Sequence, residues 1–155
     1  MQKTVGDSLT KHVQMVMPEH INSSDRLFGG KLMQWVDMVA GVAARRHAGC
    51  EVTTAAIDNL HFIAPAFKDD ILQLVGRVTH VGRTSMEVRV DTYAENNDSA
   101  PRLINTAFFV MVALTGKGAP CAVPQLLLQT DGEREEHAAA ERRREMRKER
   151  RIQGF

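Results

Sequence analysis

The sequence predicts an α+β fold in which one antiparallel sheet curls around a single central helix. Three observations predict this fold: the order of the expected elements, the composition of the helix and the shortness of the turns. A strand, a helix and four further strands are expected in that order, at residues 8–17, 31–47, 52–63, 71–81, 84–95 and 103–115. The helix carries one charged residue, Asp37, between Leu32 and Ala44. A helix this apolar must be covered on nearly all sides, and a curled sheet can cover it.

Local signals support each element. Residues 8–17 alternate apolar and polar side chains, which is typical of a half-buried strand, and Pro18 ends this pattern. A polar loop ending in Gly29-Gly30 precedes the helix, and Gly49 follows its basic last turn. The later strands meet at short turns, beginning with the one at Gly82, so we expect them to pair antiparallel.

The composition changes after residue 118. We therefore expect a domain at 1–118, followed at 119–155 by a linker and a charged helical tail. Residues 131–153 are dense in charges of both signs and have few apolar side chains, so they cannot share the main core. A solvated surface helix is the favoured interpretation, with contact to a partner subunit or to phosphate groups as the alternative.

Overall composition excludes several classes of protein. The net charge of +1 argues against nucleic-acid binding. Cys50 and Cys121 form no CxxC motif and indicate neither a zinc site nor a disulfide framework. No signal peptide and no apolar run of about 18 residues occurs, so we expect a soluble, cytoplasmic protein that does not enter a membrane.

Asp37 is the main candidate for chemistry. Burying an ionised carboxylate without partners costs several kcal/mol or more, and folding alone does not require it. Asp37 therefore either has a fixed hydrogen-bonding partner or faces a cleft where an altered proton affinity is used, and we favour the cleft. Ala40, Gly41 and Ala44 leave room beside it, for a substrate slot or for close packing.

Three further groups could assist a carboxylate. Gly29 and Gly30 open the helix, where free backbone N–H groups could bind a carbonyl or an oxyanion. Asn22 could orient water or a carbonyl, although an asparagine in a loop is often only a turn former. The turn residues Gly82, Arg83, Thr84 and Ser85 could bind phosphate or amide groups, and most such turns bind nothing.

Metal and covalent catalysis fit the sequence poorly. The six histidines form no HxxxH or HExxH pair, and no GxSxG elbow is present. His61 is the one histidine inside a strand pattern, and we expect a hydrogen-bonded structural role for it. Neither a metal nor a cofactor is expected.

Five segments carry a family resemblance. They are Asn22-Ser-Ser-Asp-Arg-Leu-Phe-Gly-Gly30, Met33-Gln-Trp-Val-Asp37-Met-Val-Ala-Gly41, Val52-Thr-Thr, Asp58-Asn-Leu-His-Phe-Ile-Ala-Pro65 and Val81-Gly-Arg-Thr-Ser85. Together they resemble the hotdog-fold acyl-CoA thioester hydrolases, and in particular the cytosolic acyl-CoA hydrolase family. Many members have Asn or Gly where this chain has Ser24 and Asp25, which leaves the acyl preference open.

This resemblance implies a hotdog fold, hydrolysis of acyl-CoA thioesters, and a homo-hexamer built as a trimer of dimers. It places the catalytic acid at Asp37 and the catalytic asparagine at Asn22, which meet across a dimer interface. It places the thioester carbonyl near Gly29 and Gly30, and coenzyme A, which is part of substrate and product, at the turn 82–85.

These expectations combine into one mechanism and two alternatives. Asp37 acts as general base on a water, or attacks the thioester itself, and N–H groups at the helix start stabilise the oxyanion. A non-catalytic acyl-CoA sensor is one alternative, although only about seven residues precede the first expected strand, which leaves no room there for a DNA-binding module. A hotdog dehydratase is the other, and His61 is its only candidate base.

Overall fold

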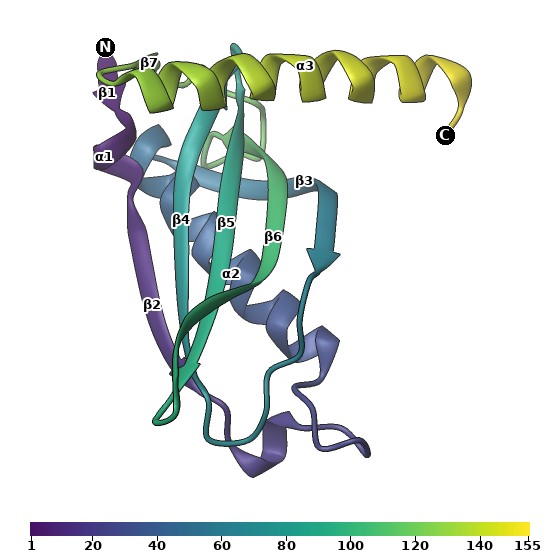
Figure 1. The fold of residues 1–155 in the computed structure, drawn as a ribbon. Helices are drawn as coiled ribbons and strands as arrows, with labels where there is room; N and C mark the ends of the chain where they lie inside the picture. Colours follow the sequence, from purple (N-terminus) through teal and green to yellow (C-terminus); the bar gives the residue numbers. More distant parts are fainter.

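The computed structural model describes all 155 residues and confirms one curled antiparallel sheet around a central helix (Figure 1). The elements are β1 (Gln2–Thr4), α1 (Val5–Ser8), β2 (Thr10–Met15), the 3-10 helix η1 (Pro18–His20), α2 (Gly29–Ala48), β3 (Glu51–Phe62), β4 (Ile71–Val81), β5 (Ser85–Asn96), β6 (Ser99–Leu114), β7 (Gln125–Leu127) and α3 (Asp131–Gln153). The five long strands are ordered β2-β4-β5-β6-β3, and all neighbours are antiparallel.

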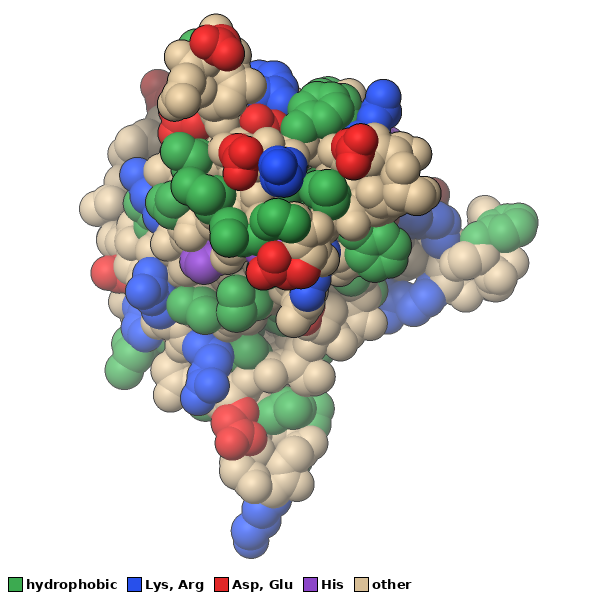
Figure 2. Space-filling model, turned by 90° about the horizontal axis from the view of Figure 1, so that it is seen from below, with side chains coloured by type: hydrophobic (Ala, Val, Ile, Leu, Met, Phe, Trp, Pro, Cys, Tyr) green, Lys and Arg blue, Asp and Glu red, His purple; other side chains and the backbone are tan.

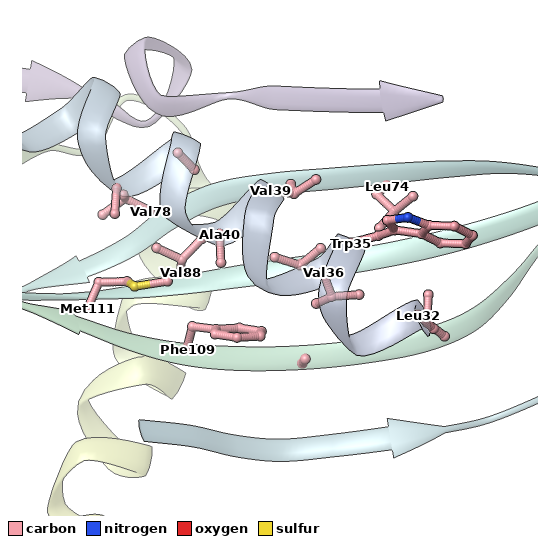
Figure 3. Close-up of a cluster of buried hydrophobic side chains, with 14 of the residues drawn as sticks. Leu32, Trp35, Val36, Val39, Ala40, Leu74, Val78, Val88, Phe109 and Met111 are labelled. Carbon is pink, nitrogen blue, oxygen red and sulfur yellow. The ribbon is translucent and has the colours of Figure 1, made fainter. Parts of the chain in front are cut away.

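The core lies between α2 and the sheet (Figure 3). Trp35, Val36 and Val39 of α2 are buried with side chains such as Val88 and Phe109 from β5 and β6. The helix approaches β4 so closely that a Cβ atom at Gly76 would lie 2.8 Å from Val39 Cγ1. The helix ends at Gly49, which adopts a φ of 72° and donates its N–H to the carbonyl of Arg45.

The N-terminal segment differs from its prediction. The strand expected at 8–17 covers only Thr10–Met15, because Val5–Ser8 form a short helix capped by Thr4 and Asp7. β1 also pairs in parallel with β7, inside the segment 119–155 where a linker was expected. Each of these two strands has three residues, too few to show a periodic pattern.

Helix α3 crosses the outer face of the sheet, opposite to α2 (Figure 1). Ala140 is its only buried residue, so this helix stays outside the main core as expected. Ion pairs attach it to the sheet: Arg143 and Arg147 to Glu87, Arg147 and Arg150 to Asp58, and Glu136 to Arg77 and Arg89. Some charged side chains of α3 therefore bind the sheet, and the others face solvent.

The central helix is not covered on all sides, contrary to the prediction. Met33, Met38 and Val42 of α2 are 37%, 50% and 37% exposed. Together with Asp37 they occupy the half of the helix that faces away from the sheet, opposite to the buried Trp35 and Val39. β3 is the edge strand beside this face, and most of its residues are exposed. A single sheet of five strands reaches around only part of the helix, so one face of α2 and the edge of β3 stay open.

Candidate active site

Asp37 lies on the open face of α2 and is hydrogen-bonded by β3. Thr54 Oγ1 donates to Asp37 Oδ1 over 2.8 Å. The other carboxylate oxygen, Oδ2, has no hydrogen bond or ion pair within the chain, and the Asp37 side chain is exposed. The expectation that its own chain buries Asp37 is therefore wrong, because the edge strand leaves this side of the helix open. Of the two alternatives, the fixed hydrogen-bonding partner is found, and it is Thr54.

The small residues near Asp37 divide between two roles. Ala40 and Ala44 are fully buried against the sheet, so they serve packing. Gly41 faces the open side, and a Cβ atom placed there would meet nothing within 4 Å. Only Gly41 therefore leaves space next to the carboxylate, as a substrate would need.

The start of α2 provides free backbone donors. The N–H groups of Gly29 and Gly30 donate to no atom of the chain, and Phe28 offers no side-chain cap. A Cβ atom at Gly30 would lie 2.7 Å from Phe28 Cε1, so a larger residue there would displace the Phe28 ring. These N–H groups stand at the positive end of the helix dipole and can bind a carbonyl or oxyanion.

Beside these donors lies a cavity of about 350 Å³ with mostly apolar walls. Gly29, Leu32, Phe62 and Ile104 contribute to it, and so does Asn22. It opens at the end of the molecule seen in Figure 2, where hydrophobic side chains gather at the surface. Three exposed hydrophobic residues, Phe28, Phe62 and Ile63, lie at or beside this cavity. Such a cavity suits a flexible hydrocarbon chain better than a polar ligand.

Asn22 organises its loop and keeps one polar group free. Its Oδ1 accepts hydrogen bonds from the N–H groups of Ser24, at 2.9 Å, and Arg26, at 3.3 Å. Its amide Nδ2 has no partner in the chain. Asp25 adopts a φ of 58°, a left-handed conformation that Asp adopts more readily than most residues other than glycine. Asn22 is thus a turn former with a free donor.

The chain does not bring Asn22 and Asp37 into contact. No hydrogen bond joins them, and Asp37 does not line the cavity at Asn22. Asn22 precedes the helix, whereas Asp37 lies two turns inside it.

The turn at 82–85 is packed against a neighbouring segment. The backbone oxygen of Thr84 accepts from Ala113 N–H at 2.9 Å, and that of Arg83 accepts from Val123 N–H at 3.0 Å. Gly82 N–H donates to Ser85 O over 2.8 Å. The Arg83 side chain is exposed. The turn is therefore fixed in position while its side chains remain available.

Among the remaining histidines and cysteines, His61 differs from the prediction. The side chain of His61 is exposed and makes no hydrogen bond, because β3 is an edge strand, so the expected structural role is wrong. Cys50 and Cys121 are free thiols whose sulfur atoms lie 3.4 Å apart.

One group of side chains could hold a metal ion. The ligand atoms of His80, His137 and Glu141 lie within 4.8 Å of one another. They lie where α3 packs on β4, on the face of the sheet opposite to Asp37. This group is separate from the carboxylate site, and its histidines are too far apart in sequence to form a motif.

The fold and the site define a thioesterase of the hotdog fold. Residues 25–100 match the family described as the Thioesterase superfamily. The acyl-CoA thioester hydrolase YkhA of Bacillus subtilis is 38% identical over 136 residues, which cover 87% of this chain and 79% of that protein. The chain belongs to the acyl-CoA thioester hydrolases of this fold.

A longer relative and two relatives of known structure support the same family assignment. A cytosolic acyl coenzyme A thioester hydrolase of Rattus norvegicus is 32% identical over 135 residues, 84% of this chain but 35% of that protein. An acyl-CoA hydrolase of Staphylococcus aureus, solved with butyryl coenzyme A and coenzyme A, superposes with a TM-score of 0.93 at 34% identity, covering 99% of this chain and 94% of that one. A hexameric acyl-CoA thioesterase gives 0.93 at 38% identity, with 96% of each chain covered.

Thr54 is a site residue that sequence reasoning missed. Structures exist of the Staphylococcus aureus hydrolase with an asparagine, an aspartate or a threonine replaced by alanine. These positions are spaced along that protein as Asn22, Asp37 and Thr54 are spaced here. Thr54 belongs to a segment that carried the family resemblance, but the approach of β3 to Asp37 has no signal in local sequence.

Proposed function

We propose that this protein hydrolyses acyl-CoA thioesters to a fatty acid and coenzyme A, with Asp37 as the catalytic carboxylate and Asn22 of a neighbouring subunit assisting. The hydrogen bond between Thr54 and Asp37 carries the proposal. It fixes a carboxylate on the open face of α2, with one oxygen held and the other free to take a proton. The free N–H groups of Gly29 and Gly30, at the start of α2, supply the site for the oxyanion that forms during the reaction.

As general base, Asp37 acts through its free oxygen. Asp37 Oδ2 takes a proton from a water molecule, and the oxygen of that water forms a bond to the thioester carbonyl carbon. The carbonyl oxygen becomes negative and is stabilised by the N–H groups of Gly29 and Gly30. The C–S bond then breaks, and the proton held by Asp37 passes to the departing thiolate. Direct attack by the carboxylate, which gives an anhydride that water then hydrolyses, is the alternative route.

The remaining parts of the substrate have places suited to their chemistry. The apolar cavity beside Gly29 takes the acyl chain, and the turn at Gly82, Arg83, Thr84 and Ser85 contacts coenzyme A. The active assembly is a homo-hexamer built as a trimer of dimers, in which Asn22 and Asp37 come from different subunits. Similarity to a hexameric thioesterase supports the hexamer.

The enzyme acts in the cytoplasm without a metal or other cofactor and binds no nucleic acid. Two observations support this location. A rat relative is named as cytosolic. None of the helices combines the length and hydrophobicity needed to cross a membrane.

A thiol-release assay with acyl-CoAs from acetyl to palmitoyl tests the proposal. We expect release of coenzyme A, with a maximum at the chain length that the cavity accommodates. A sensor of the same fold would bind acyl-CoA and release no thiol, and a dehydratase would leave the thioester intact. Absence of thiol release across the whole series would refute the hydrolase function.

A further inference from the structure

Three side chains of metal-binding type meet where α3 packs on β4. They are His80 of β4 and, one turn apart on α3, His137 and Glu141. Glu141 Oε1 lies 3.9 Å from His80 Nε2 and 4.0 Å from His137 Nδ1. Residues four apart share one face of a helix, so α3 presents two of the three groups together. We call these three residues the His-His-Glu cluster.

A β-bulge in β4 turns His80 toward α3. Val78 pairs with Val88 of β5. His80 pairs with Glu87, the residue before Val88, so Thr79 is an extra residue in β4. Val78 is buried in the core, and in a regular strand His80 would share that face, because alternate residues point the same way. The bulge instead places His80 on the face that α3 covers, and bulges often redirect a side chain in this way next to a functional site.

The polar atoms of the cluster have no hydrogen-bonding partner in the chain. His80 is only 7% exposed, and neither of its ring nitrogens forms a hydrogen bond. The side chains of His137 and Glu141 form none either. Two other carboxylates between α3 and the sheet, Glu87 and Glu136, are each paired with two arginines. Because buried polar groups normally have a partner, the unpaired ring of His80 indicates a ligand.

The charges around His80 favour its neutral form. Burial lowers the pKa of His80, and His137 and Arg144 lower it further, against the opposite effect of Glu141 and Glu87. The imidazole of His80 is therefore uncharged at neutral pH, and a neutral imidazole is the form that binds metal ions.

The donor set selects the kind of ion. Two imidazole nitrogens and a carboxylate oxygen suit Zn²⁺ and similar transition-metal ions, whereas Mg²⁺ and Ca²⁺ prefer oxygen ligands. Tetrahedral bonds of about 2.0–2.2 Å to Zn²⁺ place ligand atoms about 3.4 Å apart, so the three side chains have to close by about 1 Å. Glu141 is exposed and His137 is half-buried, so both can turn toward the ring of His80 without disturbing the core.

We propose that the His-His-Glu cluster binds one Zn²⁺ or a similar divalent transition-metal ion, with water completing the coordination. The ion links α3 to β4. It takes no part in hydrolysis, because the cluster lies on the face of the sheet opposite to Asp37. Such a link suits α3, because Ala140 is the only buried residue of this helix and its attachment depends on polar groups.

Calorimetry with ZnCl₂ tests the site in the full-length protein after treatment with EDTA. We expect the wild type to bind one Zn²⁺ per chain. Loss of an outer-shell group costs about 10–100-fold in metal affinity, so His137→Ala and Glu141→Gln, which each remove a ligand, should bind at least about tenfold more weakly. Glu149→Gln is the matched control and should bind like the wild type, because Glu149 is exposed on the same helix and forms no ion pair.

Cys50 and Cys121 are the competing site, because their sulfur atoms lie 3.4 Å apart and thiolates also bind zinc. The double variant Cys50→Ser, Cys121→Ser should keep the zinc affinity of the wild type. Thermal unfolding gives a second readout: Zn²⁺ should raise the Tm of the wild type and leave that of His137→Ala unchanged, since binding to the folded state stabilises it. Absence of binding to the wild type, or binding that survives in His137→Ala and is lost in the cysteine variant, would overturn the proposal.

Discussion

Asp37 is poised for proton transfer because its two oxygens have different surroundings. Oδ1 is held by Thr54, and Oδ2 has no partner in the chain. Replacing Asp37 by Asn keeps the size and the hydrogen bond from Thr54 but removes the base. We expect kcat of Asp37→Asn to fall by about 10² to 10⁴, the usual contribution of a positioned base. Thiol release under saturating acyl-CoA measures this, and size-exclusion chromatography checks that assembly is retained. An unchanged kcat would mean that another group takes the proton.

Thr54 positions Asp37 rather than reacting itself. The Thr54→Val variant retains the shape but cannot donate to Asp37 Oδ1, whereas Thr54→Ser retains the hydroxyl. We expect kcat of Thr54→Val to fall about tenfold, since hydrogen bonds to charged groups contribute about 1.5–3 kcal/mol, and Thr54→Ser to stay within a few-fold of wild type. KM should change little in either variant. Equal losses in the two variants would show that packing around Thr54 matters and the hydroxyl does not.

The two residues of this pair differ in how far sequence could reveal them. Asp37 is conspicuous because it is the only charged residue between Leu32 and Ala44, the apolar part of the helix. Thr54 is one of two adjacent threonines on an exposed edge strand, where threonine is common. Its role depends on which face of α2 the strand β3 approaches, and that is a property of the tertiary structure.

At the scale of elements, α3 is held to the sheet by buried charge. Glu87 is almost fully buried and receives Arg143, Arg147 and Thr79. Burial alone would raise the pKa of Glu87, but the hydrogen bonds from Arg143 and Thr79 and the nearby arginine charges outweigh it, so the pKa lies below its usual value. The pKa of Asp58 is lowered in the same way, against its burial, by Arg150 and Arg147.

A lowered pKa makes stability depend on pH in a defined direction. Glu87 is charged above its unfolded-state pKa, where the folded protein gains the full stabilisation, and this gain is lost as pH falls through the lower folded-state pKa. For Glu87→Gln we expect a loss of about 3 kcal/mol at neutral pH, the low end for a broken buried ion pair because Arg143 keeps some contact with water. The variant should also lose less stability than the wild type on acidification below pH about 4.5.

Urea unfolding at several pH values measures both effects. Glu135→Gln is the matched control, because Glu135 is exposed on α3 and forms no ion pair. Its stability should stay within about 0.5 kcal/mol of wild type. If Glu87→Gln behaves like this control, the ion pairs of α3 do not stabilise the fold.

Long elements were predictable and short ones were not. The expected helix at 31–47 and strand at 71–81 match α2 and β4 closely, because each has a long periodic pattern. β1 and β7 exist only because each supplies the other with hydrogen bonds across more than a hundred residues. The position of α3 depends on carboxylates of the sheet that look like ordinary surface charges in the sequence.

At the scale of the whole molecule, a single chain leaves an apolar helix face and a strand edge uncovered. α2 exposes Met33, Met38 and Val42, and β3 is an unpaired edge strand beside them. Exposed apolar faces and free strand edges are the features that a second subunit covers. The prediction from sequence that one sheet encloses α2 on nearly all sides fails, because the five strands reach around only part of the helix.

Sharing of the site between subunits can be tested by mixing two inactive proteins. Asn22→Ala and Asp37→Asn each lack one of the two groups. If every site takes Asn22 from one subunit and Asp37 from the other, a mixed dimer has one intact site and one that lacks both groups. Co-expression with random pairing should then restore about one quarter of wild-type kcat per site, since half of the dimers are mixed and half of their sites are intact.

The pair Thr54 and Asp37 supplies the control for this experiment, because their hydrogen bond lies within one chain. Mixing Thr54→Val with Asp37→Asn leaves one defect in every site of a mixed dimer, so activity should not exceed the average of the two parents. Restoration by the first mixture and not by the second would place Asn22 and Asp37 on different subunits. Failure of both mixtures, with mixed dimers shown by mass spectrometry, would instead require Asn22 and Asp37 to work within one subunit.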